Sequence, residues 1–431
     1  MQYKLVLNIS DRQKSAGLRL SGPTLVPNRR IKLAERMSGF ARLGFTYDPF
    51  SHTEAEVELR LPEYYIKPPY YADILGDAEN QTSWIVFGDF GRGKSALRGQ
   101  IYSDLRSDPS DRIVCVTYDD FTGLVESKRI EEVSLADHLD QVMMRLVLAF
   151  LALVAKRKSE VKLNQVQRQT AQWFTQKYFK SLSRAEAETF LDSVSTIDDK
   201  TRKVVREQKG AITNLIVNVA LGYFGLPAIK IDLPSDGDSE CVPVENSYLL
   251  LQRLYDLYSI FGVRSLVVLV DRVDQSKKEL SDPANVVKFL STLLWNYNIL
   301  GLKEAGVSRQ VLGFKFFLPF EKETKEELKK QKFRFDRVLP QNISWTDELL
   351  RTIWRKRLAH FSDNRILDLA VVCDDAQIDN TILARSRGIP RRMLTMGRYI
   401  LLEFNNLTDK PRKIPKECVE RGLHNFENEF G

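Results

Sequence analysis

The stretch FGDFGRGKSALRG at residues 87–99 constrains this chain more than any other part of the sequence. It follows the apolar run WIVF and precedes a helix-forming run. The glycine, lysine and serine positions of the pattern G-x-x-x-x-G-K-[ST] are filled by Gly88, Gly93, Lys94 and Ser95. In such a loop the backbone N–H groups surround a phosphate chain, and glycine permits the φ values that this needs. The stretch therefore predicts a strand, a phosphate-binding loop and a helix that begins near Lys94.

Each polar group of the loop has a predicted role. Lys94 reaches the β- and γ-phosphates, the Ser95 hydroxyl binds Mg²⁺, and the start of the helix adds the positive end of its dipole. The residues expected to contact the nucleotide are Gly88, Gly91, Arg92, Gly93, Lys94, Ser95 and Ala96. The alternative is an ordinary turn between a strand and a helix. We expect ATP and Mg²⁺ as ligands.

A second stretch, SLVVLVDRVD at residues 265–274, supplies a partner for this loop. Five consecutive apolar residues predict a fully buried strand, and Asp271 follows at its C-terminal tip. In a doubly wound sheet that tip faces the ligand crevice, where an aspartate can hold Mg²⁺. The alternative is an aspartate that ends a strand in a turn. Ser95 and Asp271 are the predicted metal-binding pair.

Strand patterns alternate with helical ones along the chain, which predicts an α/β fold with a doubly wound parallel sheet. We expect strands in WIVF, RIVCVTY, RSLVVLVDRVDQ, VLGFKFFLPF and FRFDRVLPQNISW. A region at about 130–245 has almost no strand pattern and predicts a large helical insertion. The expected domains are a basic N-terminal arm at 1–45, the α/β core at 46–345 and a C-terminal helical lid at 346–431.

The formal net charge of +7 is unevenly distributed. Residues 1–40 hold eight Lys and Arg against two acids, and residues 381–431 hold ten against six. Residues 41–380 therefore carry a net charge of −3. A basic arm on an acidic body suggests nucleic acid as a partner, because a polyanion attracts such a segment. The alternative is that the arm packs on the acidic middle region.

Four cysteines lie far apart in the sequence, without a C-x-x-C motif. This spacing argues against zinc and against a disulfide framework, and it is typical of a reducing compartment. The start MQYKLVLNIS has no apolar signal-peptide core, and no apolar run reaches about twenty residues. We therefore expect a cytoplasmic protein without a membrane partner.

These motifs resemble the ATPase branch of the P-loop proteins, the AAA+ and STAND-like families, over roughly residues 45–405. The stretch SRGIPRRML (386–394) resembles the element that opens their lid helix, which implies that Arg391 points back at the nucleotide. A surface arginine in a turn is the alternative. The stretch DPFSHTEAE (48–56) is similar to bacterial ATPases of this group, several of which serve in defence against phage. The resemblance implies a homo-oligomer or an effector partner.

One residue departs from the family pattern. Many AAA+ enzymes place a glutamate after the metal-binding aspartate, where it orients the attacking water, but this chain has Arg272, and the next carboxylate is Asp274. Either Asp274 takes that role, or hydrolysis is slow and the protein works mainly as a nucleotide-gated switch. The alternative to an ATPase is a non-hydrolysing, ATP-dependent scaffold or DNA-binding regulator. The chain has no N-K-x-D motif for guanine, so a GTPase is disfavoured.

Two further pairs are weaker candidates. Arg334 and Arg337 lie near the last expected strand, where this family often presents an arginine to a neighbouring subunit's nucleotide. The alternative is a solvated basic strand edge. Tyr70 and Tyr71 precede the first strand closely enough to stack on adenine, or else pack in the core.

Overall fold

The computed structural model describes residues 40–58, 60–157, 162–179, 244–409 and 411–430. Almost all of the basic N-terminal arm lies outside these residues. So does residue range 180–243 of the expected helical insertion.

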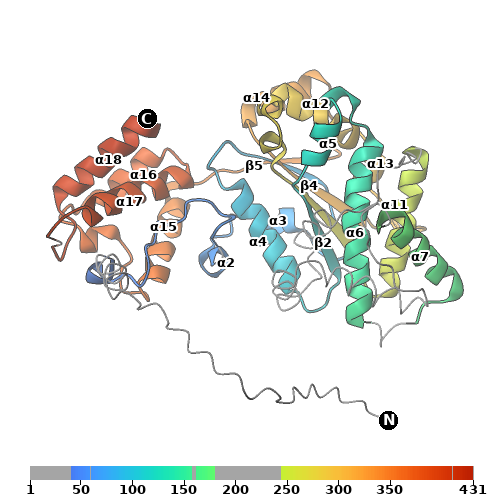
Figure 1. The fold of residues 1–431 in the computed structure, drawn as a ribbon, viewed down its shortest axis with the longest axis horizontal. Coiled ribbons are helices and arrows are strands. Elements are labelled where there is room, and N and C mark those ends of the chain that lie inside the picture. The colour runs from blue at the N-terminus through green and yellow to red at the C-terminus, as the bar shows by residue number, and fades with distance from the viewer. Residues whose placement is uncertain (1–39, 59, 158–161, 180–243, 410, 431) are drawn as a thin grey trace, which may run out of the picture.

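The centre of the protein is a sheet of five parallel strands in the order β2-β3-β4-β1-β5 (Figure 1). The strands are β1 (Trp84–Phe87), β2 (Ile113–Tyr118), β3 (Ser265–Val270), β4 (Leu312–Leu318) and β5 (Leu339–Asn342). Each lies within a run for which the sequence predicted a strand. The predicted α/β class with a parallel sheet is therefore confirmed.

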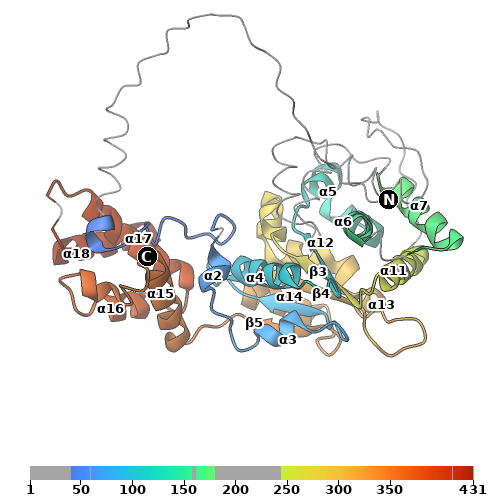
Figure 2. The same ribbon diagram turned by 90° about the horizontal axis from the view of Figure 1, so that it is seen from below.

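Both faces of the sheet are buried, as a parallel sheet requires. Side chains alternate along β1, so that Ile85 and Phe87 join one apolar cluster and Val86 joins another. The first cluster includes residues of α6 (Leu135–Arg157), α11 (Val244–Ile260) and α12 (Pro283–Leu294). The second includes residues of α3 (Tyr71–Leu75) and α4 (Lys94–Ser107). Figure 2 shows α6 and α3 on opposite sides of the sheet.

The other helices of the α/β part are α2 (Leu61–Tyr64), α5 (Thr122–Ser127), α7 (Gln165–Phe179), α13 (Tyr297–Leu300) and α14 (Glu321–Lys330). Short 3₁₀ turns are η1 (Ile130–Glu132), η2 (Val273–Gln275), η3 (Lys278–Ser281) and η4 (Leu369–Val372). Helices α6 and α7 form the described part of the expected insertion. Within the described ranges, no helix combines the length and the apolar character needed to cross a bilayer.

The C-terminal region is helical from Asp347 onward, as predicted. It consists of α15 (Asp347–Phe361), α16 (Ile378–Ser386), α17 (Pro390–Asn405) and α18 (Lys416–Phe430). These helices form a second apolar core beside the sheet (Figure 1). Residues Leu43, Phe45, Phe50 and Tyr64 belong to that core. Residues on both sides of the boundary predicted at residue 45 therefore pack in the C-terminal core.

The path of the chain places a crevice beside β1. After β1 the chain continues through α4 to β2 at the far edge, whereas after β4 it continues through α14 to β5 on the other side of β1. Connections that leave neighbouring parallel strands in opposite directions open a crevice at their carboxyl ends, where ligands bind in such sheets. The glycine-rich loop of residues 88–93 lies at this point of the fold.

Candidate functional site

The glycine-rich loop adopts a backbone that side chains would obstruct. Gly91 has φ +78° and Gly93 has φ +96°, in the left-handed region that favours glycine. A Cβ on Gly91 would lie 2.9 Å from the Cβ of Arg391. Gly93 is the N-cap of α4, whose first residue is Lys94. The predicted order of strand, loop and helix is therefore present, with the N-terminus of α4 at the end of the loop.

Lys94 folds back along the loop. Its Nζ donates to the carbonyl of Gly88 at 2.5 Å and to that of Asp89 at 3.3 Å. It also lies 5.5 Å from the ring centre of Phe90. Burial lowers the pKa of Lys94, against the opposing effect of Asp274 and other carboxylates nearby. The ammonium group is thus held by loop carbonyls that an anionic ligand can replace.

Ser95 and Asp271, predicted as a pair, are in contact. The Ser95 Oγ lies 3.2 Å from Asp271 Oδ2, across 176 positions of the sequence. Asp271 is 2% exposed, and burial raises the pKa of its carboxyl although Arg98 opposes this. The Arg98 Nε lies 3.0 Å from Asp271 Oδ2, and its Nη1 lies 2.7 Å from Asp119 Oδ2. Arg98 therefore joins the ends of β2 and β3 to the first turns of α4.

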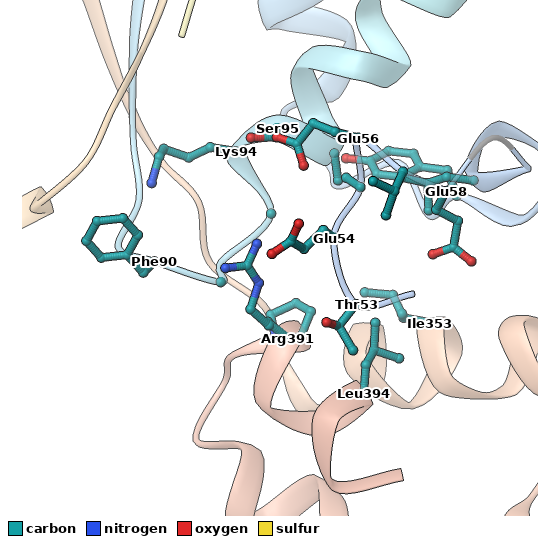
Figure 3. A pocket seen from close by; sticks show the side chains of 18 of the residues that line it. Thr53, Glu54, Glu56, Glu58, Phe90, Lys94, Ser95, Ile353, Arg391 and Leu394 are labelled. Carbon is teal, nitrogen blue, oxygen red and sulfur yellow. The ribbon is translucent and has the colours of Figure 1, made fainter. Parts of the chain in front are cut away.

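A third carboxylate, Glu56, reaches the same place from the segment before the sheet. Its Oε1 lies 3.2 Å from Nη2 of Arg272, and its carboxylate lies within hydrogen-bonding reach of the Ser95 hydroxyl. Burial acts to raise the pKa of Glu56, but the Ser95 hydroxyl and the Arg272 charge outweigh burial and lower it. Figure 3 shows Glu56 beside Ser95. Sequence reasoning missed this residue, and its only signal was the stretch DPFSHTEAE.

A buried arginine of α15 holds that segment. The Nη2 of Arg357 lies 2.8 Å from Glu58 Oε1, with side chains 2% and 6% exposed. The same guanidinium donates to the hydroxyl of Tyr64 at 3.2 Å and to the carbonyl of His52 at 2.8 Å. Because a buried ion pair is costly to break by removing one partner, these contacts fix the path of the segment.

These elements surround one cavity of about 540 Å³, a size typical of small-molecule sites. Figure 3 shows side chains from the loop, the preceding segment and the C-terminal helices around it. The predicted site residues that line it are Gly91, Gly93, Lys94, Ser95, Ala96, Asp271, Asp274 and Arg391. A more apolar part of the lining comes from Leu61, Tyr65, Ile66, Ile353 and Leu394. The lining therefore combines polar and apolar side chains.

Two predicted loop residues are not among the lining residues. The N–H of Gly88 donates to the carbonyl of Leu318 at 3.2 Å, as a continuation of the sheet. The Nε of Arg92 lies 3.5 Å from Asp89 Oδ2, and the carbonyl of Arg92 accepts from Trp345 Nε1 at 2.7 Å. In this structure Arg92 stabilises the loop rather than facing the cavity.

The start of α17 touches the loop directly. Arg391 donates its backbone N–H to the carbonyl of Gly91 at 3.2 Å, and its side chain lines the cavity. Figure 3 shows its guanidinium pointing toward Glu54, which enters from the opposite wall. Arg391 therefore lines the same cavity as the glycine-rich loop, and its role toward a nucleotide stays a prediction.

Asp274 lies in η2, just after β3, and lines the same cavity. Burial raises the pKa of its carboxyl, and the charge of Lys94 opposes that rise. A carboxyl with a raised pKa in a cavity is suited to accept or donate a proton.

The remaining candidates lie outside the cavity lining. Tyr71 is buried and donates from its hydroxyl to Asp104 at 2.8 Å, and burial raises the pKa of Tyr70 to about 12. Both are packing residues in this structure. Arg334 is exposed and pairs with Asp336 at 2.6 Å, and Arg337 is exposed as well.

The oxygen atoms of Ser95 and Asp271 are of the kind that binds Mg²⁺. The described residues include no group of three or more His, Cys, Asp or Glu side chains placed to hold an ion. Mg²⁺ in proteins is bound through one or two carboxylates together with waters and substrate phosphates. The Ser95 hydroxyl and the Asp271 carboxylate fit that pattern.

Comparisons with protein-family models, with curated proteins and with solved structures found no match for this chain. The functional assignment therefore depends on the motifs and on the geometry of the cavity.

Proposed function

We propose that the chain binds ATP with Mg²⁺ in the cavity beside β1 and hydrolyses it, as a P-loop ATPase of the AAA+ and STAND-like group. The observation that carries this proposal is the convergence on one cavity of three predicted groups: Lys94, the Ser95–Asp271 pair and Arg391. They come from the start of α4, from the position just after β3 and from the start of α17, which are far apart in the sequence.

Each group has a defined role toward a triphosphate. The N–H groups of the loop and the N-terminus of α4 bind phosphate oxygens. Lys94 exchanges the carbonyls of Gly88 and Asp89 for the β- and γ-phosphates. Ser95 and Asp271 hold Mg²⁺, which, when bound, neutralises charge that develops on the phosphates. Asp274 accepts a proton from the attacking water.

The site also suggests how nucleotide state is coupled to the rest of the protein. The cavity is lined by both the sheet region and the C-terminal helices, so a bound nucleotide contacts both. ATP therefore favours one arrangement of α17 against the loop, and hydrolysis releases it. The resemblance to bacterial ATPases of phage defence suggests that this arrangement controls self-association or an effector partner.

A second function is favoured by one specific observation. Arg272 replaces the glutamate that orients water in many AAA+ enzymes, and it forms an ion pair with Glu56. A protein of this kind could bind ATP tightly without turnover and act as a scaffold or DNA-binding regulator. A single-turnover assay separates the two functions: an ATPase hydrolyses the bound ATP, and a scaffold or regulator does not. Mass photometry with ATP and with DNA reports the assembly in either case.

The decisive test is the Lys94→Ala variant, with ATP affinity measured by isothermal titration calorimetry. We expect ATP binding to fall below detection while the circular dichroism spectrum and the melting temperature stay close to wild type. The matched control is Lys322→Ala, since Lys322 is an exposed lysine of α14 that does not line the cavity. A folded Lys94→Ala protein with the ATP affinity of the wild type would refute the assignment.

A further inference from the structure

The residue after Asp271 is an arginine that pairs with a carboxylate from a distant part of the sequence. Arg272 has φ +62°, an uncommon conformation for a non-glycine residue, and its side chain pairs with Glu56. The two side chains are 33% and 24% exposed. Arg272 and Glu56 both line the cavity, and the Glu56 carboxylate meets the Ser95 hydroxyl there.

Glu56 is held in place from both sides along its own segment. Six residues before it, Phe50 is fully buried among the C-terminal helices and stacks on Trp354 with ring centres 4.9 Å apart. Two residues after it, Glu58 forms a buried ion pair with Arg357. A side chain between two buried anchors has little freedom to leave the cavity.

Two carboxylates therefore lie near the Ser95 hydroxyl. Asp271 reaches it from β3, and Glu56 reaches it from the segment before the sheet. A hydroxyl that binds Mg²⁺ lies next to the other ligands of the ion, and Mg²⁺ takes up to two carboxylates along with its waters.

We propose that Glu56 is a second carboxylate of the Mg²⁺ site, supplied by the segment before the sheet and positioned by Arg272. This inference depends on the proposed ATP site and adds a residue to it. Its physical consequence is a stronger dependence of ATP binding on the metal. Without Mg²⁺, the charge of Glu56 repels the triphosphate, and with Mg²⁺ the same charge attracts the complex.

The experiment measures the dissociation constant of ATP by calorimetry, once in EDTA and once in saturating Mg²⁺. The ratio of the dissociation constant in EDTA to that in Mg²⁺ reports how much the metal strengthens ATP binding. Its measurement does not require turnover. We expect Glu56→Gln to reduce this ratio by about tenfold or more, because even groups that only orient metal ligands contribute that much to metal affinity. In EDTA, the same variant should bind ATP at least as tightly as the wild type.

Four further variants sharpen the result. Glu63→Gln removes an equal charge from an exposed residue of α2 outside the cavity, and it should leave the ratio unchanged. Arg272→Gln should lower the ratio, because Glu56 loses the partner that positions it. Arg272→Lys keeps the positive charge and should lower the ratio less. Glu56→Asp keeps the charge but withdraws it from Ser95, so it should also lower the ratio if Glu56→Gln fails to fold.

The outcomes distinguish this inference from the proposed function. A wild-type ratio in folded Glu56→Gln, in a protein whose ATP binding is lost in Lys94→Ala, would overturn the role of Glu56 alone. Wild-type protein that binds no ATP, with or without Mg²⁺, would overturn both.

Discussion

The backbone N–H of Arg391 donates a hydrogen bond of 3.2 Å to the carbonyl of Gly91. This bond joins the first turn of α17 to the glycine-rich loop, 300 positions earlier in the chain. It places the loop and the C-terminal helices against each other without any side chain between them. The loop and α17 are therefore expected to respond together to a bound nucleotide.

Gly91→Ala should disrupt this contact. The new Cβ would lie 2.9 Å from Cβ of Arg391 and 3.1 Å from Cγ2 of Ile389, at a φ of +78° that strains any L residue. We expect a loss of stability of about 1–2 kcal/mol from the left-handed backbone alone, and at least tenfold weaker ATP binding. Urea unfolding and calorimetry measure the two effects.

Gly99→Ala is the matched control for that variant. Gly99 lies inside α4, and a Cβ there would meet no atom within 4 Å. Alanine is favoured over glycine in a helix by about 1 kcal/mol, so this control should be neutral or stabilising. If Gly91→Ala binds ATP as well as Gly99→Ala does, the loop–α17 contact has no part in binding.

The two aspartates after β3 should respond differently to the same substitution. Asp271→Asn removes a carboxylate that contacts Ser95 and Arg98, so Mg²⁺-dependent ATP binding should weaken. Asp274→Asn should keep binding and lose turnover by about a hundredfold or more, as for a lost general base. Each variant is the control for the other in binding and single-turnover assays. Undiminished turnover in Asp274→Asn would assign the base to another carboxylate.

Local patterns were sufficient to predict the loop, α4 and the sheet. WIVF followed by a glycine-rich stretch predicts β1 and the loop, and an unbroken apolar run predicts β3 with Asp271 at its tip. Parallel strands that end at one edge bring such residues together, so the Ser95–Asp271 contact could be predicted without coordinates.

Glu56 could not be predicted in the same way. It lies in a segment without regular structure, which has no periodicity to interpret. Its position depends on Phe50 in the second core and on the contact between Arg357 and Glu58, which are 299 positions apart. Such contacts result from the packing of distant parts of the chain, so this side of the cavity could not be predicted from the sequence.

Stability should decrease as the pH falls, because of the buried His138. Its Nε2 contacts the carbonyl of Phe289 at 2.9 Å, and its Nδ1 contacts the Tyr118 hydroxyl at 2.8 Å. A carbonyl only accepts, so Nε2 carries the proton and Nδ1 accepts from Tyr118. Burial lowers the pKa of His138 to about 4, although the hydrogen bond to Phe289 opposes this.

The unfolded chain therefore takes up a proton at this residue before the folded protein does. The contribution of His138 is fully present above a pH of about 6.5, falls between there and about 4, and amounts to roughly 3 kcal/mol in total. Urea unfolding at about pH 7.5 and about pH 5 should show a larger difference for the wild type than for His138→Gln. Equal differences would show that His138 does not contribute to the pH dependence.

The last prediction concerns residues 1–40, which carry a net charge of +6. The basic residues there include Arg29, Arg30, Lys32 and Arg36, and we expect them to contact nucleic acid. Phosphates neutralised by cations release counterions, so four such contacts give a slope of roughly −3 to −4 in log affinity against log salt. Fluorescence anisotropy with a labelled DNA duplex at several salt concentrations measures this slope.

Because the expected contacts are with phosphates, affinity should depend little on the DNA sequence. Deletion of residues 1–39 should weaken binding and flatten the slope, and replacing Arg29, Arg30, Lys32 and Arg36 together by alanine should reproduce most of that change. Two duplexes of unrelated sequence should give the same result with the full chain. If the deletion leaves both the affinity and the slope unchanged, the arm serves another purpose, such as packing on the acidic region of residues 41–380.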